Sequence, residues 1–390
     1  MILKVYVHDF HQEIGHTRAT IDLLNHLTLE QKSGITEIHI CSFTATEPTK
    51  LLDFPNAKVV FDKVPFPNLY PFILKSFFFQ LWTAFNYFFE KKEGVVHLSV
   101  GIAFLFPDIV NIQFIHHHWD EINDLYKNTS IHKRFYKWLL FRYFNILEKC
   151  IYRRHDLKFL VLSQFSKDYL IKKFSLEEKN VLLTYSNVNT SSFFVLNESK
   201  NSILEKLGEE AAFVKGLDFS KPIFLFVGAF ERKGLDIALK LLEKNPGLQF
   251  IIIGKSESGS REMLKSDFLK IFYVPFTKKI NYYYNLADYF IFPTRYEPFG
   301  LVILEAAITG LHILVPKKNV GASELLYEDS FTTFLDEVDF DFSAIKTFSI
   351  DEKIKLADSR KVSLQKLSWD KSAALFYEKI LMKYLPSPRR

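Results

Sequence analysis

Thr294-Arg-Tyr-Glu-Pro-Phe-Gly-Leu-Val-Ile-Leu-Glu-Ala-Ala307 is the stretch of this chain that decides its fold. It follows the short apolar run Tyr289–Pro293, which is typical of a buried parallel strand. Pro298 suits the first position of a helix, where a missing N–H costs nothing. The apolar face of that helix is predicted to consist of Leu301, Leu304 and Ile308. A strand followed directly by a helix is the unit of a parallel α/β sheet.

Two glutamates flank the start of this predicted helix. Glu297 lies at its mouth and Glu305 about two turns inside, so that they are roughly 12 Å apart along the axis. This is about the span from the sugar to the ribose of a nucleotide-sugar, and a helix N-terminus offers N–H groups and a positive dipole to a diphosphate. The alternative is that Glu297 caps a helix in solvent and Glu305 lies on the surface.

Glu297, the run Pro298–Leu301 and Glu305 together resemble the donor motif of the retaining glycosyltransferases of family 4. The resemblance implies the GT-B fold, an α/β architecture of two Rossmann-like doubly wound domains facing across a cleft. It also implies that Glu297 holds sugar hydroxyls, assisted by N–H groups near Phe299 and Gly300, and that Glu305 holds the ribose. The donor-binding residues implied in this motif are Glu297, Phe299, Gly300, Leu301 and Glu305.

A loop rich in cations follows the predicted strand Pro222–Gly228. Gly228 lets the backbone approach a ligand, and Arg232 and Lys233 can clamp a diphosphate and stabilise the charge on a departing nucleotide. The resembled family uses an Arg and a Lys from this loop for that role. Its commoner arginine after the glycine is replaced here by Ala229, so Arg232 must supply the charge, as in the Phe-x-Arg-Lys-Gly form of lipopolysaccharide-core glucosyltransferases.

Three consecutive histidines, His116, His117 and His118, end the predicted strand Val110–His116. Side chains alternate along a strand, so the three cannot all face one metal, and no matching carboxylate or cysteine pattern suggests zinc. In the resembled family a histidine at this strand end contacts the donor sugar near the reacting carbon. His116 matches best and His117 second, with a packing or solubility role as the alternative at each position.

Two glycine loops match the resembled family only in part. Gly15, in the loop before the first helix, corresponds to a phosphate loop that has two glycines in the family, and His16 replaces the second. Gly321 and Glu324 resemble a Gly-Gly-x-x-Glu turn, again with one glycine missing. The chain also lacks the Asp-x-Asp motif of metal-dependent glycosyltransferases, so we expect no metal and no cofactor besides the nucleoside-diphosphate sugar substrate.

The length of 390 residues and the apolar fraction of 48% suit two packed domains. We place an acceptor-binding domain at residues 1–200 and a nucleotide-sugar-binding domain at 201–366. Residues 367–390 predict an amphipathic helix capped by Ser368, which in the resembled family crosses back onto the first domain. Two cysteines without a metal-ligand pattern argue against a disulfide scaffold, and the cytoplasm is the expected location.

The net charge of +5 is concentrated in one segment. Lys127–Lys173 holds twelve Lys or Arg against three acids, interleaved with aromatic residues. This mixture resembles a helix for anionic lipid more than a nucleic-acid site, with a core helix carrying a solvated basic rim as the alternative. The aromatic segment Pro71–Phe89 contains Lys75, Gln80 and Asn86, so we expect a buried or membrane-touching helix and no membrane span.

The sequence therefore predicts a retaining glycosyltransferase that moves a sugar from a nucleoside-diphosphate sugar to a saccharide or lipid-linked acceptor in cell-envelope glycan synthesis. Its expected partners are the nucleotide-sugar, a glycan or glycolipid acceptor and an anionic membrane surface, reached from the cytoplasmic face of the inner membrane. Nucleic acid is not expected as a partner. Two alternatives stay open, a sugar-nucleotide epimerase or hydrolase of the same fold and a non-catalytic partner of a sister transferase.

Overall fold

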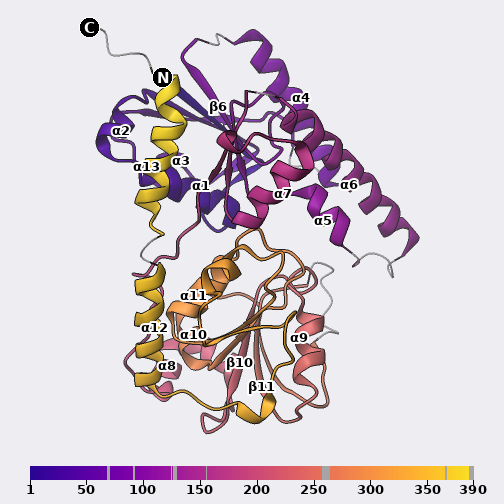
Figure 1. The fold of residues 1–390 in the computed structure, drawn as a ribbon, viewed down its shortest axis with the longest axis vertical. Coiled ribbons are helices and arrows are strands. Elements are labelled where there is room, and N and C mark those ends of the chain that lie inside the picture. Colours follow the sequence, from indigo (N-terminus) through magenta and orange to yellow (C-terminus); the bar gives the residue numbers. More distant parts are fainter. Residues whose placement is uncertain are drawn as a thin grey trace. The chain divides into compact units, whose positions relative to one another are not determined.

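The computed structural model divides the chain into two compact units (Figure 1). It describes residues 1–67, 71–90, 93–123, 125, 130–154, 156–256, 264–364 and 367–385. Unit 1 comprises Met1–Ser186 with Leu367–Arg390, and unit 2 comprises Asn187–Lys366. The sequence had placed the first boundary near residue 200.

Unit 1 is built on a seven-stranded sheet in the order β5-β3-β1-β6-β7-β8-β9, in which every pairing is parallel. Val5 in β1 pairs with Ile40 on one side and with Leu98 on the other. A second, two-stranded sheet joins the loops that follow the first strands. The strands are β1 (Ile2–Tyr6), β2 (Asp9–Phe10), β3 (Glu37–Ser42), β4 (Thr44–Ala45), β5 (Lys58–Lys63), β6 (Val95–Val100), β7 (Ile109–Ile112), β8 (Lys158–Val161) and β9 (Val181–Leu183).

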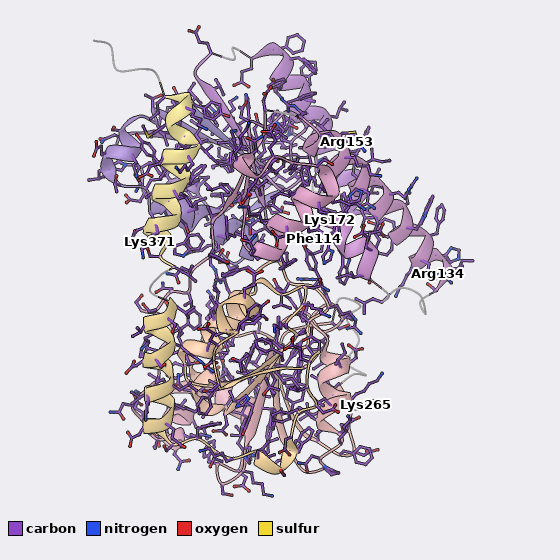
Figure 2. The ribbon with its side chains drawn as sticks, in the orientation of Figure 1. Phe114, Arg134, Arg153, Lys172, Lys265 and Lys371 are labelled. Atoms are coloured by element: carbon purple, nitrogen blue, oxygen red, sulfur yellow. The ribbon has the colours of Figure 1, made fainter. Side chains whose placement is uncertain are left out.

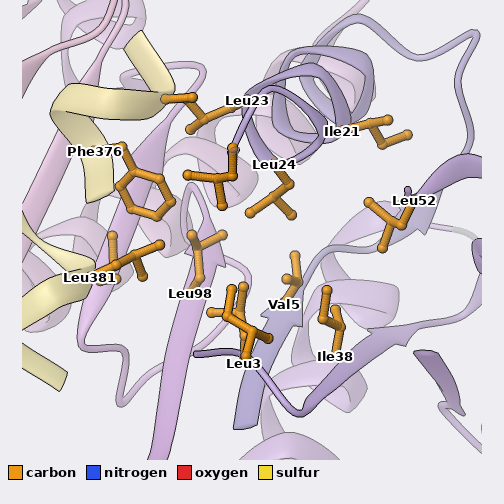
Figure 3. Close-up of a cluster of buried hydrophobic side chains, with 14 of the residues drawn as sticks. Leu3, Val5, Ile21, Leu23, Leu24, Ile38, Leu52, Leu98, Phe376 and Leu381 are labelled. Carbon is orange, nitrogen blue, oxygen red and sulfur yellow. The ribbon is translucent and has the colours of Figure 1, made fainter. Parts of the chain in front are cut away.

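Helices cover this sheet, and one of them comes from the far end of the chain. The core cluster in Figure 3 joins Leu3 and Leu98 of the sheet with Leu24 of one helix and Phe376 of the last helix. Ser368 caps that last helix by accepting the Lys371 N–H at 3.1 Å. The helices are α1 (Gly15–Asn25), α2 (Leu29–Ser33), α3 (Pro48–Leu51), α4 (Phe72–Phe89), α5 (His116–Ile122), α6 (Ile131–Tyr152), α7 (Gln164–Phe174) and α13 (Trp369–Lys379).

Unit 2 repeats the architecture with a six-stranded parallel sheet in the order β12-β11-β10-β13-β14-β15. The strands predicted at Pro222–Gly228 and Tyr289–Pro293 are confirmed as β10 and β13, whose apolar residues are nearly all buried. The strands are β10 (Ile223–Val227), β11 (Gln249–Ile253), β12 (Lys270–Val274), β13 (Tyr289–Ile291), β14 (His312–Val315) and β15 (Thr332–Phe334). The helices are α8 (Lys200–Leu207), α9 (Leu235–Leu242), α10 (Ile280–Leu286), α11 (Leu301–Ile308) and α12 (Ile350–Leu364).

The aromatic helix α4 packs with an unusual polarity. Its buried side chains include Lys75, Ser76, Gln80 and Thr83, whereas large apolar side chains on its other face are exposed. Among the described residues, we find no helix that combines the length and the apolarity needed to cross a bilayer.

Candidate active site

Two positions in the loop between β10 and α9 require glycine, because of their positive φ and the close packing around them. Gly228 has φ +143°, and a Cβ there would lie 3.0 Å from Cγ of Lys233. Gly234 has φ +78°, and a Cβ there would lie 2.1 Å from the carbonyl oxygen of Pro293. The loop therefore packs directly on the segment that follows β13, which brings Arg232 and Lys233 beside the glutamate motif.

An arginine of the motif fastens this loop in place. Arg295 donates to both carboxylate oxygens of Asp236, at 2.9 and 2.7 Å, and to the carbonyl oxygen of Glu231 at 2.9 Å. Burial alone would raise the pKa of Asp236, but the bonds from Arg295 outweigh it and hold the pKa below its ordinary value. A two-pronged pair of this kind fixes geometry as well as charge. Sequence analysis missed it, although Arg295 stands inside the quoted motif.

Glu297, Arg232 and Lys233 come together in one cluster. The Glu297 carboxylate forms an ion pair with Lys233 and lies 3.5 Å from an Arg232 guanidinium nitrogen. Burial lowers the pKa of Lys233 well below its ordinary value, and the Arg232 charge acts in the same direction. A diphosphate would offer both cations a stronger anionic partner than one carboxylate does, and it would leave Glu297 able to accept hydrogen bonds from sugar hydroxyls.

The backbone of Glu297 is held by a turn that follows β14. Its N–H donates to the carbonyl oxygen of Asn319 at 2.9 Å, and its carbonyl oxygen accepts the Gly321 N–H at 3.0 Å. Glu297 and Val320 form an isolated parallel bridge. The partial Gly-x-x-Glu match at Gly321 thus belongs to a turn that positions Glu297.

The prediction that the helix starts at Pro298 is wrong. α11 begins at Leu301, and its N-cap is Gly300 with φ +98°. The residues from Glu297 to Phe299 are held in strand-like pairing with the turn, where the Ala322 N–H donates to the Phe299 carbonyl at 2.7 Å. The spacing of about 12 Å between the glutamates counted helical rise from Glu297, so that estimate does not apply.

Glu305 is a buried residue of α11, which excludes the alternative of a surface glutamate. Its side chain is 5% exposed and accepts a hydrogen bond from the Tyr284 hydroxyl at 3.1 Å. Phe299 is buried as well, and Leu301 is half-buried. A carboxylate has about four acceptor sites, and the Tyr284 hydroxyl uses one of them.

The predicted strand Val110–His116 is too long, because β7 ends at Ile112 and His116 is the first residue of α5. The apolar Phe114 and Ile115 extend the apolar run past the true end of the strand. His117 contacts the buried Glu148 through Nδ1 at 2.9 Å. His118 packs on the ring of Tyr169, with 4.6 Å between centroids.

His116 faces a cluster that sequence analysis missed. Burial lowers the pKa of His8 to about 3, with further lowering from Lys75, His16 and His116. Burial lowers the pKa values of His16 and His116 as well. The cluster lies at the carboxyl end of the sheet of unit 1, where ligands of such sheets bind. The signal in the sequence was His8-Asp9, directly after the first strand.

The neighbours of this histidine cluster are already bonded. The Lys75 ammonium donates to the Asp9 carboxylate at 2.6 Å, and the Thr44 hydroxyl donates to the same carboxylate at 2.7 Å. Gly15, the first residue of α1, has no atom within 4 Å of the place where a Cβ would lie, so the packing of the chain does not require glycine there.

The metal expectation stays a prediction. Within the parts of the chain that the structure describes, no three His, Cys, Asp or Glu side chains form a group suited to a metal ion. Two cations, Arg232 and Lys233, lie together beside Glu297.

Comparisons with known proteins agree with this geometry. The family model described as Glycosyl transferases group 1 matches residues 209–337, which include the cation loop and both glutamates. A probable transglycosylase of Burkholderia thailandensis is 31% identical over 97 residues. That match spans 25% of this chain and only 24% of the length of the relative.

Solved structures resemble nearly the whole chain in fold. Sucrose-phosphate synthase from Thermosynechococcus elongatus has a TM-score of 0.70 at 15% identity, over 99% of both chains. WaaG, a glycosyltransferase involved in lipopolysaccharide biosynthesis, has a TM-score of 0.62 at 14% identity, over 99% of this chain and 97% of that one. HepE of Anabaena in complex with UDP and glucose has a TM-score of 0.61 at 13% identity, over 98% of this chain and 100% of that one.

At these identities the solved structures establish the fold alone, and the family match concerns residues 209–337 of unit 2. Residues 209–337 therefore match the glycosyl transferases group 1 family, within a chain that has the α/β GT-B fold with two Rossmann-like sheets.

Proposed function

We propose that this protein is a retaining glycosyltransferase that moves a sugar from a nucleoside-diphosphate sugar to a saccharide or lipid-linked acceptor in cell-envelope glycan synthesis. The observation that carries the proposal is the cluster of Glu297 with Lys233 and Arg232, inside the segment that matches glycosyl transferases group 1. The fold neighbour HepE, in complex with UDP and glucose, supports a nucleoside-diphosphate sugar as the donor class.

The proposed roles follow the chemistry of each side chain. Arg232 and Lys233 neutralise the charge that develops on the departing diphosphate, and Gly228 lets the loop backbone approach it. Glu297 holds hydroxyls of the donor sugar, and Glu305 accepts hydrogen bonds from the ribose. His116 contacts the sugar near its reacting carbon. The departing phosphate helps to deprotonate the acceptor, which attacks from the same face and retains the anomeric configuration.

The test is a panel of UDP-, GDP- and ADP-sugars offered with saccharide and glycolipid acceptors. We expect one donor to be consumed only when an acceptor is present, and NMR of the product should show the anomeric configuration of the donor. Release of free nucleotide at the same rate without acceptor would favour a hydrolase or epimerase. An inverted product would exclude the retaining assignment.

We also propose that transfer needs no divalent metal, because the side-chain cations Arg232 and Lys233 can supply the positive charge that a metal would bring to the diphosphate. A strong chelator should leave the initial rate nearly unchanged. Activity lost on chelation and restored by magnesium or manganese would contradict this part of the proposal.

A lipid-linked acceptor is favoured by the outer surface of unit 1. The exposed side of α4 carries apolar residues at helical spacing, and Phe88 is 65% exposed. On α6, Trp138 is 58% exposed among cations, and Figure 2 labels Arg134 and Arg153 near the two ends of this helix. The exposed apolar residues of α4 are Leu74, Phe77, Leu81, Phe85, Phe88 and Phe89.

These two helices would attach the protein to the cytoplasmic face of the inner membrane. Soluble surfaces rarely expose an apolar stripe of this length, and α4 buries the polar side chains of Lys75, Ser76, Gln80 and Thr83. Cations near an anionic surface contribute on the order of 1 kcal/mol each. Lys127, where the basic segment of the sequence begins, lies outside the described residues. Phe144, one of the aromatic residues within this basic segment, is buried.

Vesicle sedimentation tests this attachment. Binding should require anionic lipid and fall with salt, and it should drop when Lys133, Arg134, Lys137 and Arg142 are changed to Gln. A matched variant changes four exposed lysines of unit 2, Lys215, Lys221, Lys240 and Lys244, and should bind as the wild type does. Replacing Leu81 and Phe85 with Ser should weaken the part of binding that survives high salt. Equal binding to neutral and anionic vesicles would contradict a contribution of these cations to membrane attachment.

A further inference from the structure

Glu148 is a fully buried carboxylate in the middle of unit 1. It belongs to α6, its side chain is 0% exposed, and it reaches the first turn of α5. Oε1 accepts the backbone N–H of His116 at 2.6 Å, and Oε2 accepts the backbone N–H of His117 at 2.9 Å. The same Oε2 lies 2.9 Å from Nδ1 of His117. Figure 1 shows α5 and α6 side by side.

Burying the charged carboxylate of Glu148 destabilises the fold unless hydrogen bonds compensate for the lost water. Removing a carboxylate from water costs several kcal/mol, which the three contacts and the helix N-terminus offset. α5 is seven residues long, and its N-cap residue Ile115 provides no side-chain cap. A Ser or Asp at the N-cap would satisfy so short a helix locally. In this chain Glu148 of α6 instead holds the start of α5, and the first residue of α5 is His116, which carries the candidate imidazole.

The ring of His116 is held from the same helix. Phe144 of α6 lies 4.4 Å from it, centroid to centroid. Phe144 also contacts Phe72 of α4 at 5.8 Å, and Phe72 contacts His8 at 5.4 Å. A continuous line of rings therefore joins His116 to His8 across α6 and α4. With Glu148 on its backbone and Phe144 on its ring, His116 has little freedom to move.

We propose that Glu148 is a positioning residue for sugar transfer, which fixes the backbone of His116 so that its imidazole meets the donor sugar. The inference rests on the proposed function. It assigns no contact between Glu148 and substrate, since the carboxylate already bonds the backbone N–H groups of His116 and His117 and the ring of His117. His117 thereby supports His116, and it is no longer a candidate for the histidine that contacts the donor sugar.

The test replaces Glu148 with Gln, which keeps the shape but turns an N–H₂ group toward one of the two backbone N–H groups. We expect kcat to fall roughly tenfold to a hundredfold, the effect of misplacing a reacting group by about an ångström. The Kd for free nucleoside diphosphate, which reports on unit 2, should stay within about twofold of the wild type. Glu121→Gln, on the exposed side of α5, is the matched control and should keep wild-type kcat.

A spectroscopic readout separates positioning from simple stability. Burial lowers the pKa of His116, and the Glu148 charge opposes that lowering. In Glu148→Gln the NMR titration of labelled His116 should therefore move to lower pH, whereas it should not move in Glu121→Gln. This readout needs no turnover, so it can be measured even if no donor sugar is found and the proposed function fails.

Two further variants keep the inference open to contradiction. If Glu148→Gln does not fold, Glu148→Asp keeps the buried charge and shortens its reach, and it should lower kcat with unchanged nucleotide Kd. His117→Gln leaves both backbone bonds in place and should lower kcat less than Glu148→Gln does. A folded Glu148 variant with wild-type kcat would overturn the assignment. A loss in His117→Gln equal to that in Glu148→Gln would overturn the role of the backbone bonds.

Discussion

The carboxyl ends of the two sheets carry different kinds of polar chemistry. In unit 2 the cations Arg232 and Lys233 surround the single carboxylate of Glu297. In unit 1 the pKa of His8 and that of His116 are lowered by burial, and Lys75 is already bonded to Asp9. The cluster in unit 2 suits a ligand with negative charge, whereas uncharged imidazoles suit the hydroxyls of a saccharide. We therefore propose that two sheets of one architecture bind two kinds of ligand.

The first and largest predicted difference between the two units concerns the loops that follow their first strands. Gly234→Ala places a Cβ against the Pro293 carbonyl at a left-handed residue and should destabilise the protein by roughly 2–5 kcal/mol. Gly15→Ala, with open space around it, should stabilise α1 by roughly 0.5–1 kcal/mol. Urea unfolding of both variants measures the difference. Equal effects would mean that the two loops are not built differently.

The second prediction concerns the cations of unit 2. Lys233→Ala removes a charge-assisted contact to the diphosphate and should lower kcat/KM by an amount equal to roughly 1.5–3 kcal/mol. Lys240→Ala, an exposed lysine of α9, is the matched control and should change nothing. Steady-state kinetics at equal folded fraction decides the matter. Wild-type turnover by Lys233→Ala would place the clamp elsewhere.

The third prediction concerns the imidazoles of unit 1. The pKa of His8 is lowered to about 3 in the folded protein. Between that pH and about pH 6.5, His8 is therefore protonated in the unfolded chain and neutral in the folded protein. The contribution of neutral His8 is complete above about pH 6.5 and is lost as the pH falls, by up to about 1.4 kcal/mol per pH unit. Urea unfolding between pH 7 and pH 4 should show a smaller loss in His8→Leu. Identical slopes in His8→Leu and the wild type would contradict the prediction.

The smallest expected effect separates the two glutamates. Glu305→Ala should weaken binding of free nucleoside diphosphate by about 1 kcal/mol, the contribution of one net hydrogen bond. Glu297→Ala should spare nucleotide binding and reduce sugar transfer, since a diphosphate takes over Lys233 and Arg232 when it binds. Calorimetric titration of both variants compares them, and equal losses of affinity would remove the separate roles.

The contrast between the units also shows what could be predicted from the sequence. The strand predicted at Pro222–Gly228 lies within one residue of β10 at each end, because a strand buried on both faces is a continuous apolar run. Glu297, Arg232 and Lys233 could be found because they stand in short local patterns. The contacts that hold the site could not, because they join residues far apart in sequence. Arg295 and Asp236 are 59 residues apart, and His117 and Glu148 are 31 apart.

The errors have local physical causes. The start of α11 was misplaced because Pro298 suits a helix start, while pairing of Glu297 with Val320 keeps the chain extended to Gly300. The strand before His116 was made too long because apolar residues continue past Ile112 into a loop. Periodicity detects elements well and their ends poorly when tertiary contacts set the ends.

The central claim is that unit 2 binds a nucleoside diphosphate through Arg232 and Lys233. Its most direct test is calorimetric titration of the full chain with UDP, GDP and ADP, repeated with the matching monophosphates and with Lys233→Ala. One diphosphate should bind saturably at one site, more tightly than its monophosphate, and that preference should shrink in Lys233→Ala. No saturable binding of any diphosphate, or an equal preference in Lys233→Ala and the wild type, would contradict the account.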